Sequence, residues 1–568
     1  MRIKPLSLNS FTLLMCIKPM SLNGFTLLLV LYFVLALNLP LVGRLVTILE
    51  QTENLTLGMV LSLPFFFGAL FYLLFSLFTV RYLVKPVAVT LVLLSSLVSY
   101  AMFQFGILVD SDMIRNIVET NSGEALAYLN RSSLLWWLGT GLLPAFLIIR
   151  MPLRYNGFLK EMLLKGGSML VAVLVVVLIA SLYYKDYAAL GRNNSYLKSM
   201  IIPSQFLWSV GKYVNNTYLS PERPYQSLGL DATVADGSTT RSPRLTVLVV
   251  GETARAMNFE LNGYPRPTNA FTRDLDMLSF QTVSSCGTAT AISVPCMFSR
   301  LDKSDYDPTI SKTQDNLLDV LSHANVLVRW MENDGGCKGV CARVPTIEFS
   351  PDSASERCDG EYCRDEVLLD NLQAELDALK GRDAVLVLHL VGSHGPTYYQ
   401  RYPAAFQRFM PDCPRSDIQN CSDAEIVNSY DNTLYHDDYI LSQIIALLKQ
   451  READWQSNML YISDHGESLG ENGMYLHGMP YAFAPKEQTH VPLLTWMSPE
   501  FSLEGGYDRA CLEQSAKNGS FSHDNLFDSV LGLMQVSTGI YRPKQDIFGS
   551  CRQSSMIALS ASATPDPS

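Results

Sequence analysis

Five apolar stretches lie within the first 185 residues, at about 24–43, 57–80, 87–109, 134–149 and 167–184. Each is long enough, or nearly so, for the roughly 20 residues of helix that cross a bilayer. Charged residues make up only 17% of the chain, against about 25% in soluble domains, and they are scarce in this part. These features exclude a simple soluble globular protein, a disordered chain and a coiled coil. They predict a membrane domain over residues 1–185.

The basic residues of the connecting loops set the orientation of these spans. The N-terminus and the loops after the second and fourth spans hold nine of them: Arg2, Lys4, Lys18, Arg81, Lys85, Arg150, Arg154, Lys160 and Lys165. The alternate loops hold three: Arg44, Arg115 and Arg131. Because basic loops stay in the cytoplasm, the N-terminus is predicted to be cytoplasmic and everything after residue 185 to lie outside.

Cysteine usage agrees with this orientation. One cysteine, Cys16, lies in the apolar part, and the other ten follow residue 285. An even number in one polar region indicates disulfides formed in an oxidising compartment. Zinc binding through Cys337 and Cys341, or through Cys358 and Cys363, is the competing interpretation. The net charge of −11 argues against nucleic-acid binding.

The two ends of the chain carry less information. Residues 3–16 nearly repeat as 17–30, and no small-residue cleavage site follows, so an uncleaved span is favoured over a signal peptide. A start at Met1 or at Met20 is left open. The tail, 553–568, is expected to be disordered.

A connector is expected over residues 186–243. Within it, 196–213 mixes apolar, aromatic and basic side chains, as helices at a membrane surface do. Residues 218–243 are rich in Ser, Thr, Pro and Asp and have no apolar period, which is typical of a linker.

Residues 244–552 are enough for one large domain. Short apolar runs, typical of buried strands, alternate with segments of helical spacing. The runs are 245–250, 384–391 and 459–463, and the helical segments are 314–323 and 366–379. This alternation predicts an α/β fold with a mostly parallel sheet.

Polar residues follow each predicted strand. Glu252 and Thr253 follow the first, His394 the second, and Asp464 and His465 the third. Each feature alone is a common loop or capping arrangement, but open α/β sheets bind ligands where their strands end. The joint pattern therefore predicts a single site.

The residue types at this site suit zinc. Glu252, Asp464 and His465 supply oxygen and nitrogen ligands, and Thr253 is expected in the fourth position, where a dication would lower the pKa of its hydroxyl. His394 and His477 suit phosphate binding or protonation of a leaving alkoxide, and Lys338 is a further cationic contact. Five other histidines are read as structural or surface residues: His323, His389, His436, His490 and His523.

Long motifs carry a family resemblance. They are VVGETARAMNFELNGYPRPTN, which contains Glu252 and Thr253, SCGTATAISVPCMF (285–298), VGSHGPTYYQRYP (391–403), SYDNTLYHDDY (429–439) and SDHGESLGENGMYLHGMP (463–480). The chain resembles the phosphoethanolamine–lipid A transferases, which include the mobile colistin-resistance enzymes. The resemblance covers nearly the whole chain.

This resemblance implies a multi-pass protein of the bacterial inner membrane with five spans and a periplasmic domain of alkaline-phosphatase-like fold. Phosphatidylethanolamine would donate phosphoethanolamine to Thr253, and a lipid A phosphate would then accept it. Surface negative charge would fall, and with it the binding of polymyxin and other cationic peptides.

The resemblance also assigns residues. One zinc ion would be firmly bound by Glu252, Thr253, Asp464 and His465, with room for a second. The matching substrate or second-metal contacts are His394, His477, Lys338, Glu467 and Asp334. Short-range bridges of the family match Cys286–Cys296, Cys337–Cys341, Cys358–Cys363 and Cys413–Cys421, which leaves Cys511 with Cys551.

Other functions remain open at this point. A phosphodiesterase or sulfatase of the same fold would transfer to water, and a phosphoglycerol transferase would share the membrane bundle and the threonine nucleophile. A catalytically dead receptor would have lost part of the site, which is complete here. The residues do not indicate whether the 1 or the 4′ phosphate of lipid A, or a core sugar, is modified.

Overall fold

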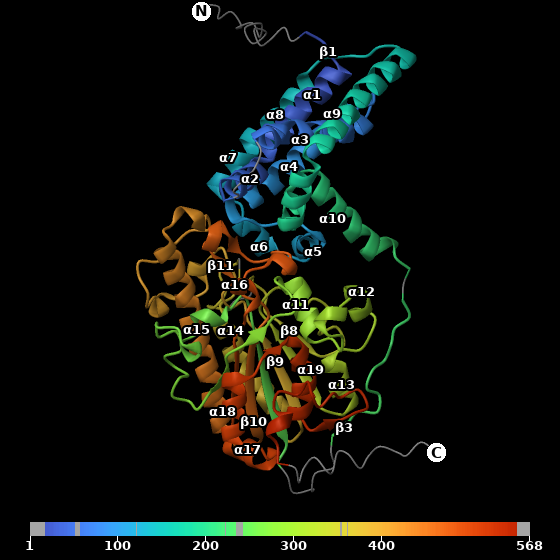
Figure 1. The fold of residues 1–568 in the computed structure, drawn as a ribbon. Coiled ribbons are helices and arrows are strands. Elements are labelled where there is room, and N and C mark those ends of the chain that lie inside the picture. Colours follow the sequence, from blue (N-terminus) through green and yellow to red (C-terminus); the bar gives the residue numbers. More distant parts are fainter. Residues whose placement is uncertain are drawn as a thin grey trace, which may run out of the picture. The chain divides into compact units, whose positions relative to one another are not determined.

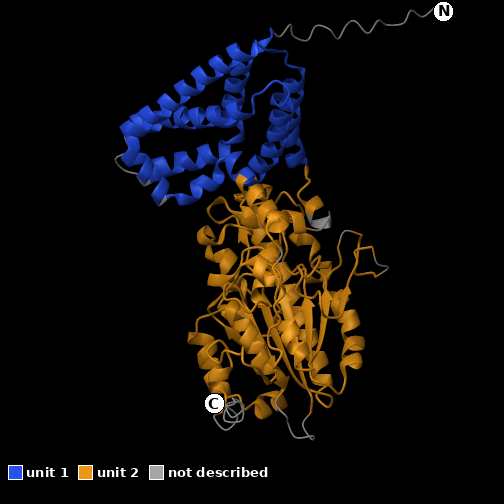
Figure 2. Ribbon diagram, turned by 90° about the vertical axis from the view of Figure 1, so that its right-hand side faces the viewer, with its two compact units in different colours: residues 1–103, 131–207 blue, residues 104–130, 208–568 orange. Residues whose placement is uncertain are grey.

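The computed structural model describes residues 18–51, 57–120, 122–221, 223–234, 242–352, 355–360 and 362–553. Two compact units divide the chain (Figure 2): residues 1–103 with 131–207, and residues 104–130 with 208–568. The first copy of the N-terminal repeat and the tail from residue 554 lie outside the described residues. The predicted division into 1–185, 186–243, 244–552 and 553–568 stays a prediction. It does not include the grouping of residues 104–130 with the C-terminal unit.

The apolar helices of the first unit match the predicted spans. Among the described residues, four helices are long and apolar enough to cross a membrane: Leu57–Phe78 (α3), Val84–Phe105 (α4), Arg131–Arg150 (α7 to α8) and Phe158–Ala188 in α9. A fifth span results if the bent pair Leu22–Leu37 and Leu39–Glu50, which meet at 61°, counts as one. The expected connector is helical over Ser204–Val214 (α10), and its position at a membrane surface stays a prediction.

A seven-stranded sheet forms the centre of the second unit. Its order is β5 (Leu278–Phe280), β13 (Leu493–Met497), β10 (Gln456–Ser463), β4 (Arg244–Gly251), β9 (Ala384–His389), β7 (Leu327–Glu332) and β8 (Thr346–Glu348). Strands β10, β4, β9, β7 and β8 are parallel, and β13 is antiparallel to both of its neighbours. The predicted α/β fold with a mostly parallel sheet is confirmed.

Helices on both faces explain why the central strands β10, β4 and β9 are buried along their whole length (Figure 1). All eight residues of β4 are buried. Its Leu248 and Val250 pack in one core with residues of α13 (Leu317–His323) and α19 (Leu526–Leu533). The long helix α15 (Asp423–Gln450) packs against β10 and α14 (Glu366–Leu379). Since the strands are parallel, β10, β4, β9 and β7 end at the same edge of the sheet.

Candidate active site

Glu252, Asp464 and His465 meet at the ends of β4 and β10, as the sequence predicts. All three are buried, and one ligand atom of each lies within 4.8 Å of the others. His465 Nδ1 lies 3.0 Å from the carbonyl oxygen of Gly466 and therefore carries the proton. His465 Nε2 lies 3.4 Å from Glu252 Oε1 and 3.3 Å from Asp464 Oδ2.

This arrangement fits a bound cation. Burial lowers the pKa of His465 to about 4, so the imidazole is neutral at physiological pH. Its Nε2 lone pair then faces two carboxylates, an unfavourable arrangement of three buried acceptors unless a cation lies between them. Imidazole nitrogen with two carboxylates is a common donor set for zinc. These three residues are therefore suited to hold a metal ion.

Thr253 approaches this group through its backbone. Its N–H donates to Asp464 Oδ1 at 3.3 Å, and its carbonyl accepts the Tyr430 hydroxyl at 2.7 Å. Its φ of 52° is rare for a β-branched residue. Its hydroxyl is buried and has no hydrogen-bond partner among the described residues. The predicted roles of this hydroxyl, as nucleophile and as metal ligand, stay predictions.

A different threonine, which the sequence reasoning did not single out, places its hydroxyl at the metal group. Thr290 Oγ1 donates to Glu252 Oε2 at 3.1 Å and lies 3.5 Å from His465 Nε2. Thr290 is the first residue of α11 (Thr290–Met297), so the positive end of this helix is adjacent to its hydroxyl. The motif at 285–298 was the available signal, and it contains two threonines that spacing alone does not distinguish.

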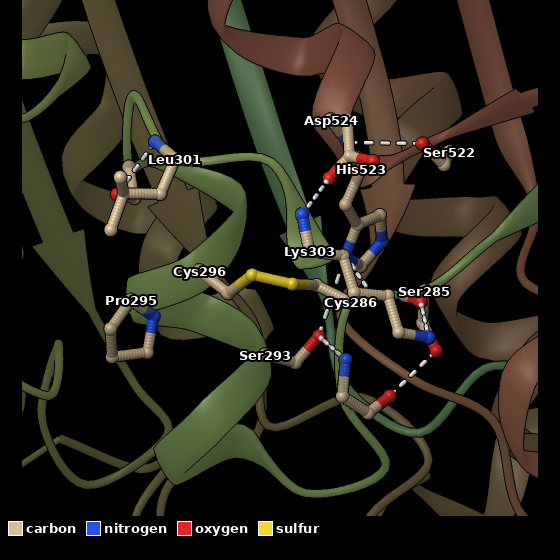
Figure 3. The surroundings of a disulfide bond; sticks show 12 residues. Ser285, Cys286, Ser293, Pro295, Cys296, Leu301, Lys303, Ser522, His523 and Asp524 are labelled. Atoms are coloured by element: carbon tan, nitrogen blue, oxygen red, sulfur yellow. Dashed lines mark hydrogen bonds between the residues drawn. A yellow bond between two sulfur atoms is a disulfide. The ribbon is translucent and has the colours of Figure 1, made fainter. Parts of the chain in front are cut away.

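The segment that carries Thr290 is held at both ends (Figure 3). The Cys286–Cys296 disulfide closes the loop around it. The Cys286 N–H donates to His523 Nδ1 at 3.0 Å. His523 Nε2 donates to the carbonyl of Ser463 at 2.9 Å. Burial lowers the pKa of His523 to about 4, so it remains neutral in this position. The loop before α11 is thereby fixed to the end of β10.

The two histidines predicted to contact substrate also lie here. The His477 ring is centred 4.7 Å from the ring of His465 and 5.2 Å from that of His394. Glu467 Oε2 lies 3.0 Å from His477 Nδ1, and Glu467 Oε1 accepts the Tyr398 hydroxyl at 2.7 Å. Glu467 therefore orients His477. The predicted contact of Glu467 with substrate stays a prediction.

A second group that could hold a metal shares Glu252. Its other members are Asp334, which follows β7, and His389, the last residue of β9. His389, which the sequence predicts to be a structural or surface residue, is buried and belongs to this group. Burial opposes its charge, but Glu332, 2.9 Å away, and Asp334 raise its pKa to about 9. Burial raises the pKa of Asp334 to about 6.

Lys338 lies in the same loop as Asp334, between Cys337 and Cys341. Its Nζ donates to the carbonyl of Gly335 at 3.4 Å in an exposed environment, so its predicted contact with phosphate stays a prediction. The Cys337–Cys341 bridge is one of five disulfides, and all five predicted pairs are present: Cys286–Cys296, Cys337–Cys341, Cys358–Cys363, Cys413–Cys421 and Cys511–Cys551.

Comparison with known proteins identifies both parts of the chain. Residues 244–536 match the sulfatase family, and residues 67–218 match the family "Phosphoethanolamine transferase EptA/EptB". Phosphoethanolamine transferase EptA of Escherichia coli K12 is 38% identical over 524 residues, which cover 92% of this chain and 95% of the relative. Phosphatidylethanolamine transferase Mcr-1 of Escherichia coli is 33% identical over 521 residues, which cover 88% of this chain and 95% of that relative.

A solved structure agrees along nearly the whole chain. It is the integral membrane protein lipooligosaccharide phosphoethanolamine transferase A of Neisseria meningitidis, with a TM-score of 0.90 and 38% identity over 94% of this chain and 100% of that one. Matches at this coverage include both the apolar helices and the α/β domain. The chain therefore belongs to the phosphoethanolamine transferases of the EptA and Mcr type, multi-pass enzymes of the bacterial inner membrane with a periplasmic catalytic domain.

Proposed function

We propose that this enzyme transfers phosphoethanolamine from phosphatidylethanolamine to a phosphate of lipid A through a covalent intermediate on Thr290. The observation that carries the assignment is the position of Thr290 Oγ1, 3.1 Å from Glu252 Oε2 and 3.5 Å from His465 Nε2. The relatives include a phosphatidylethanolamine transferase and a lipooligosaccharide phosphoethanolamine transferase, which supports this donor and this class of acceptor.

The first step forms a bond between Thr290 Oγ1 and phosphorus and breaks the bond from phosphorus to the diacylglycerol oxygen. Glu252 Oε2 accepts the hydroxyl proton, since it already receives that hydrogen bond. His477, oriented by Glu467, protonates the leaving alkoxide. Zinc held by Glu252, Asp464 and His465 would stabilise negative charge and lower the pKa of a nearby hydroxyl.

In the second step an oxygen of the lipid A phosphate attacks the phosphothreonine. The bond from phosphorus to Oγ1 breaks, and Glu252 returns the proton to Thr290. The attacking P–OH of lipid A gives its proton to His477, which restores the enzyme. The N-terminus of α11 stabilises the phosphoryl group in both steps, because its first N–H groups and its dipole favour negative charge. The ammonium group added to lipid A offsets one negative charge, so the membrane surface binds cationic peptides such as polymyxin less strongly.

The test is expression in a bacterium with unmodified lipid A, followed by mass spectrometry of that lipid. Wild type and a Thr253→Ala variant are expected to add phosphoethanolamine, and Thr290→Ala is expected to add none. Incubation with phosphatidylethanolamine alone should leave a phosphothreonine at residue 290. An inactive Thr253→Ala variant, with Thr290→Ala still modifying lipid A, would return the nucleophile to Thr253. A lipid without any added phosphoethanolamine would refute this donor and acceptor.

A further inference from the structure

A pocket of about 170 Å³ lies within the C-terminal unit. It is lined by Asp110 and the first turn of helix α5 (Ser111–Glu119), by residues 286–289 and Ile292, by Lys303 and Tyr306, and by residues 478–481. We call it the α5 pocket. Helix α5 belongs to the segment 104–130, which lies between two apolar helices in the sequence but groups with the catalytic residues in space.

The walls of the α5 pocket are formed by residues adjacent in sequence to the reacting groups. Thr288 and Ala289 precede Thr290, and Gly478 follows His477. The Gly478 N–H donates to the carbonyl of Thr288 at 2.7 Å, so the two loops are joined. Helix α5 closes over them: a Cβ on Gly478 would lie 2.0 Å from Met113 Cε. The two loops that line the pocket therefore also carry Thr290 and His477.

The charges of the pocket are divided between its walls. Asp110 Oδ1 caps α5 by accepting the N–H groups of Asp112 and Met113, at 3.0 and 2.9 Å. In the described part of the chain no basic side-chain nitrogen lies within 4.0 Å of the carboxylate of Asp110 or that of Asp112. On the other wall, Lys303 Nζ rests against the Tyr481 ring, 3.4 Å from the carbonyl of Ser285.

These charges favour a small cation. The carboxylates of Asp110 and Asp112 and the ammonium of Lys303 give the lining residues a net charge of −1. Burial raises the pKa of Asp110 to about 6, so this carboxylate is mostly ionised at neutral pH. The positive charge of Lys212 lowers the pKa of Asp110 only in part, and no ion pair joins the two among the described residues. The Tyr481 ring and the Ser285 carbonyl contact the Lys303 ammonium, and burial lowers the pKa of Lys303 to about 8.

We propose that the α5 pocket binds the ammonium group of the phosphoethanolamine that is transferred, with Asp110 as its counter-ion. The inference rests on the proposed function and adds a selection step to it. The ammonium is two carbons from the phosphate oxygen, and the proposal places phosphorus at Thr290 and nitrogen beside Asp110 within one headgroup. A glycerol headgroup has no charge to pair with Asp110 and would leave the carboxylate desolvated, so the pocket selects the donor lipid by its amine.

The test uses the full-length enzyme with lipid A and with phosphatidylethanolamine and phosphatidylglycerol as competing donors. Asp110→Asn removes the charge but keeps a side chain that caps helices well. The KM for phosphatidylethanolamine should rise about tenfold, with kcat changed by less than about twofold, and the preference over phosphatidylglycerol should fall by the same factor. Asp508→Asn, at the N-cap of α18 (Arg509–Asn518), is the matched control and should behave as wild type.

Lys303→Gln separates this proposal from binding of an anion in the same pocket. Retained or lower KM for phosphatidylethanolamine supports the ammonium site. A KM that rises in Lys303→Gln and stays unchanged in Asp110→Asn overturns it, as does an unchanged donor preference in Asp110→Asn. Wild-type enzyme that does not consume phosphatidylethanolamine would instead refute the proposed function, before any variant is compared.

Discussion

Replacing Gly392 by alanine should disable the site without unfolding the protein. Gly392 follows β9 with a φ of 47°, and a Cβ at this position would lie 2.9 Å from the carbonyl oxygen and 3.0 Å from the nitrogen of Glu252. Ordinary contact begins near 3.4 Å, so the two backbones must separate by about 0.5 Å. Backbone atoms cannot rotate out of the way, and Glu252 belongs to both groups that could hold a metal and accepts the hydrogen bond of Thr290.

Gly381 provides the matched control. Its φ is 83°, and a Cβ there would have no heavy atom within 4 Å. Both alanine variants therefore incur the cost of a left-handed conformation, about 1–2 kcal/mol, which should lower Tm by about 2–4 °C. Only Gly392→Ala should also move the catalytic groups, and displacements of this size lower turnover by about tenfold or more.

The assay is release of diacylglycerol from phosphatidylethanolamine, with the metal content of each purified variant measured in parallel. Gly392→Ala should lose turnover and retain less metal, while Gly381→Ala keeps both. The reasoning is refuted if the two variants have equal turnover at equal loss of Tm. It is also refuted if Gly392→Ala keeps its metal and its full rate.

Three further predictions follow from the same geometry. Exchanging Cys286 and Cys296 for serine should lower the free energy of unfolding by about 3 kcal/mol, since the bridge closes a loop with a sequence separation of 10; an unchanged melting temperature would contradict this. Glu467→Gln should slow transfer about tenfold at unchanged metal content, because His477 loses its charged partner; a loss of metal would assign Glu467 to coordination instead. Chelation should abolish transfer and lower Tm, and added zinc should restore both; full activity in metal-free protein would exclude a metal requirement.

The apolar spans and the α/β domain could be predicted because their signals are local. A run of about 20 apolar residues specifies a spanning helix wherever the rest of the chain lies. Short apolar runs likewise predict buried parallel strands. The residues after β4 and β10 could be predicted to converge because parallel strands end at a common edge of the sheet. The disulfide pairs followed from the resemblance of the surrounding motifs.

Tertiary structure alone decided which hydroxyl meets the metal group. Thr253 is adjacent to Glu252 in sequence, but a left-handed backbone brings it to the site through its N–H and carbonyl. Thr290 is 38 residues away, and α11, whose Ser293 donates to the carbonyl of Asp464 after β10, brings its hydroxyl to Glu252. Only the tertiary structure likewise brings His389 to Glu252 and Asp334, and groups the segment 104–130 with the C-terminal unit. Spacing along a chain records neither strand order nor the direction of a side chain, and the convergence of groups distant in sequence depends on both.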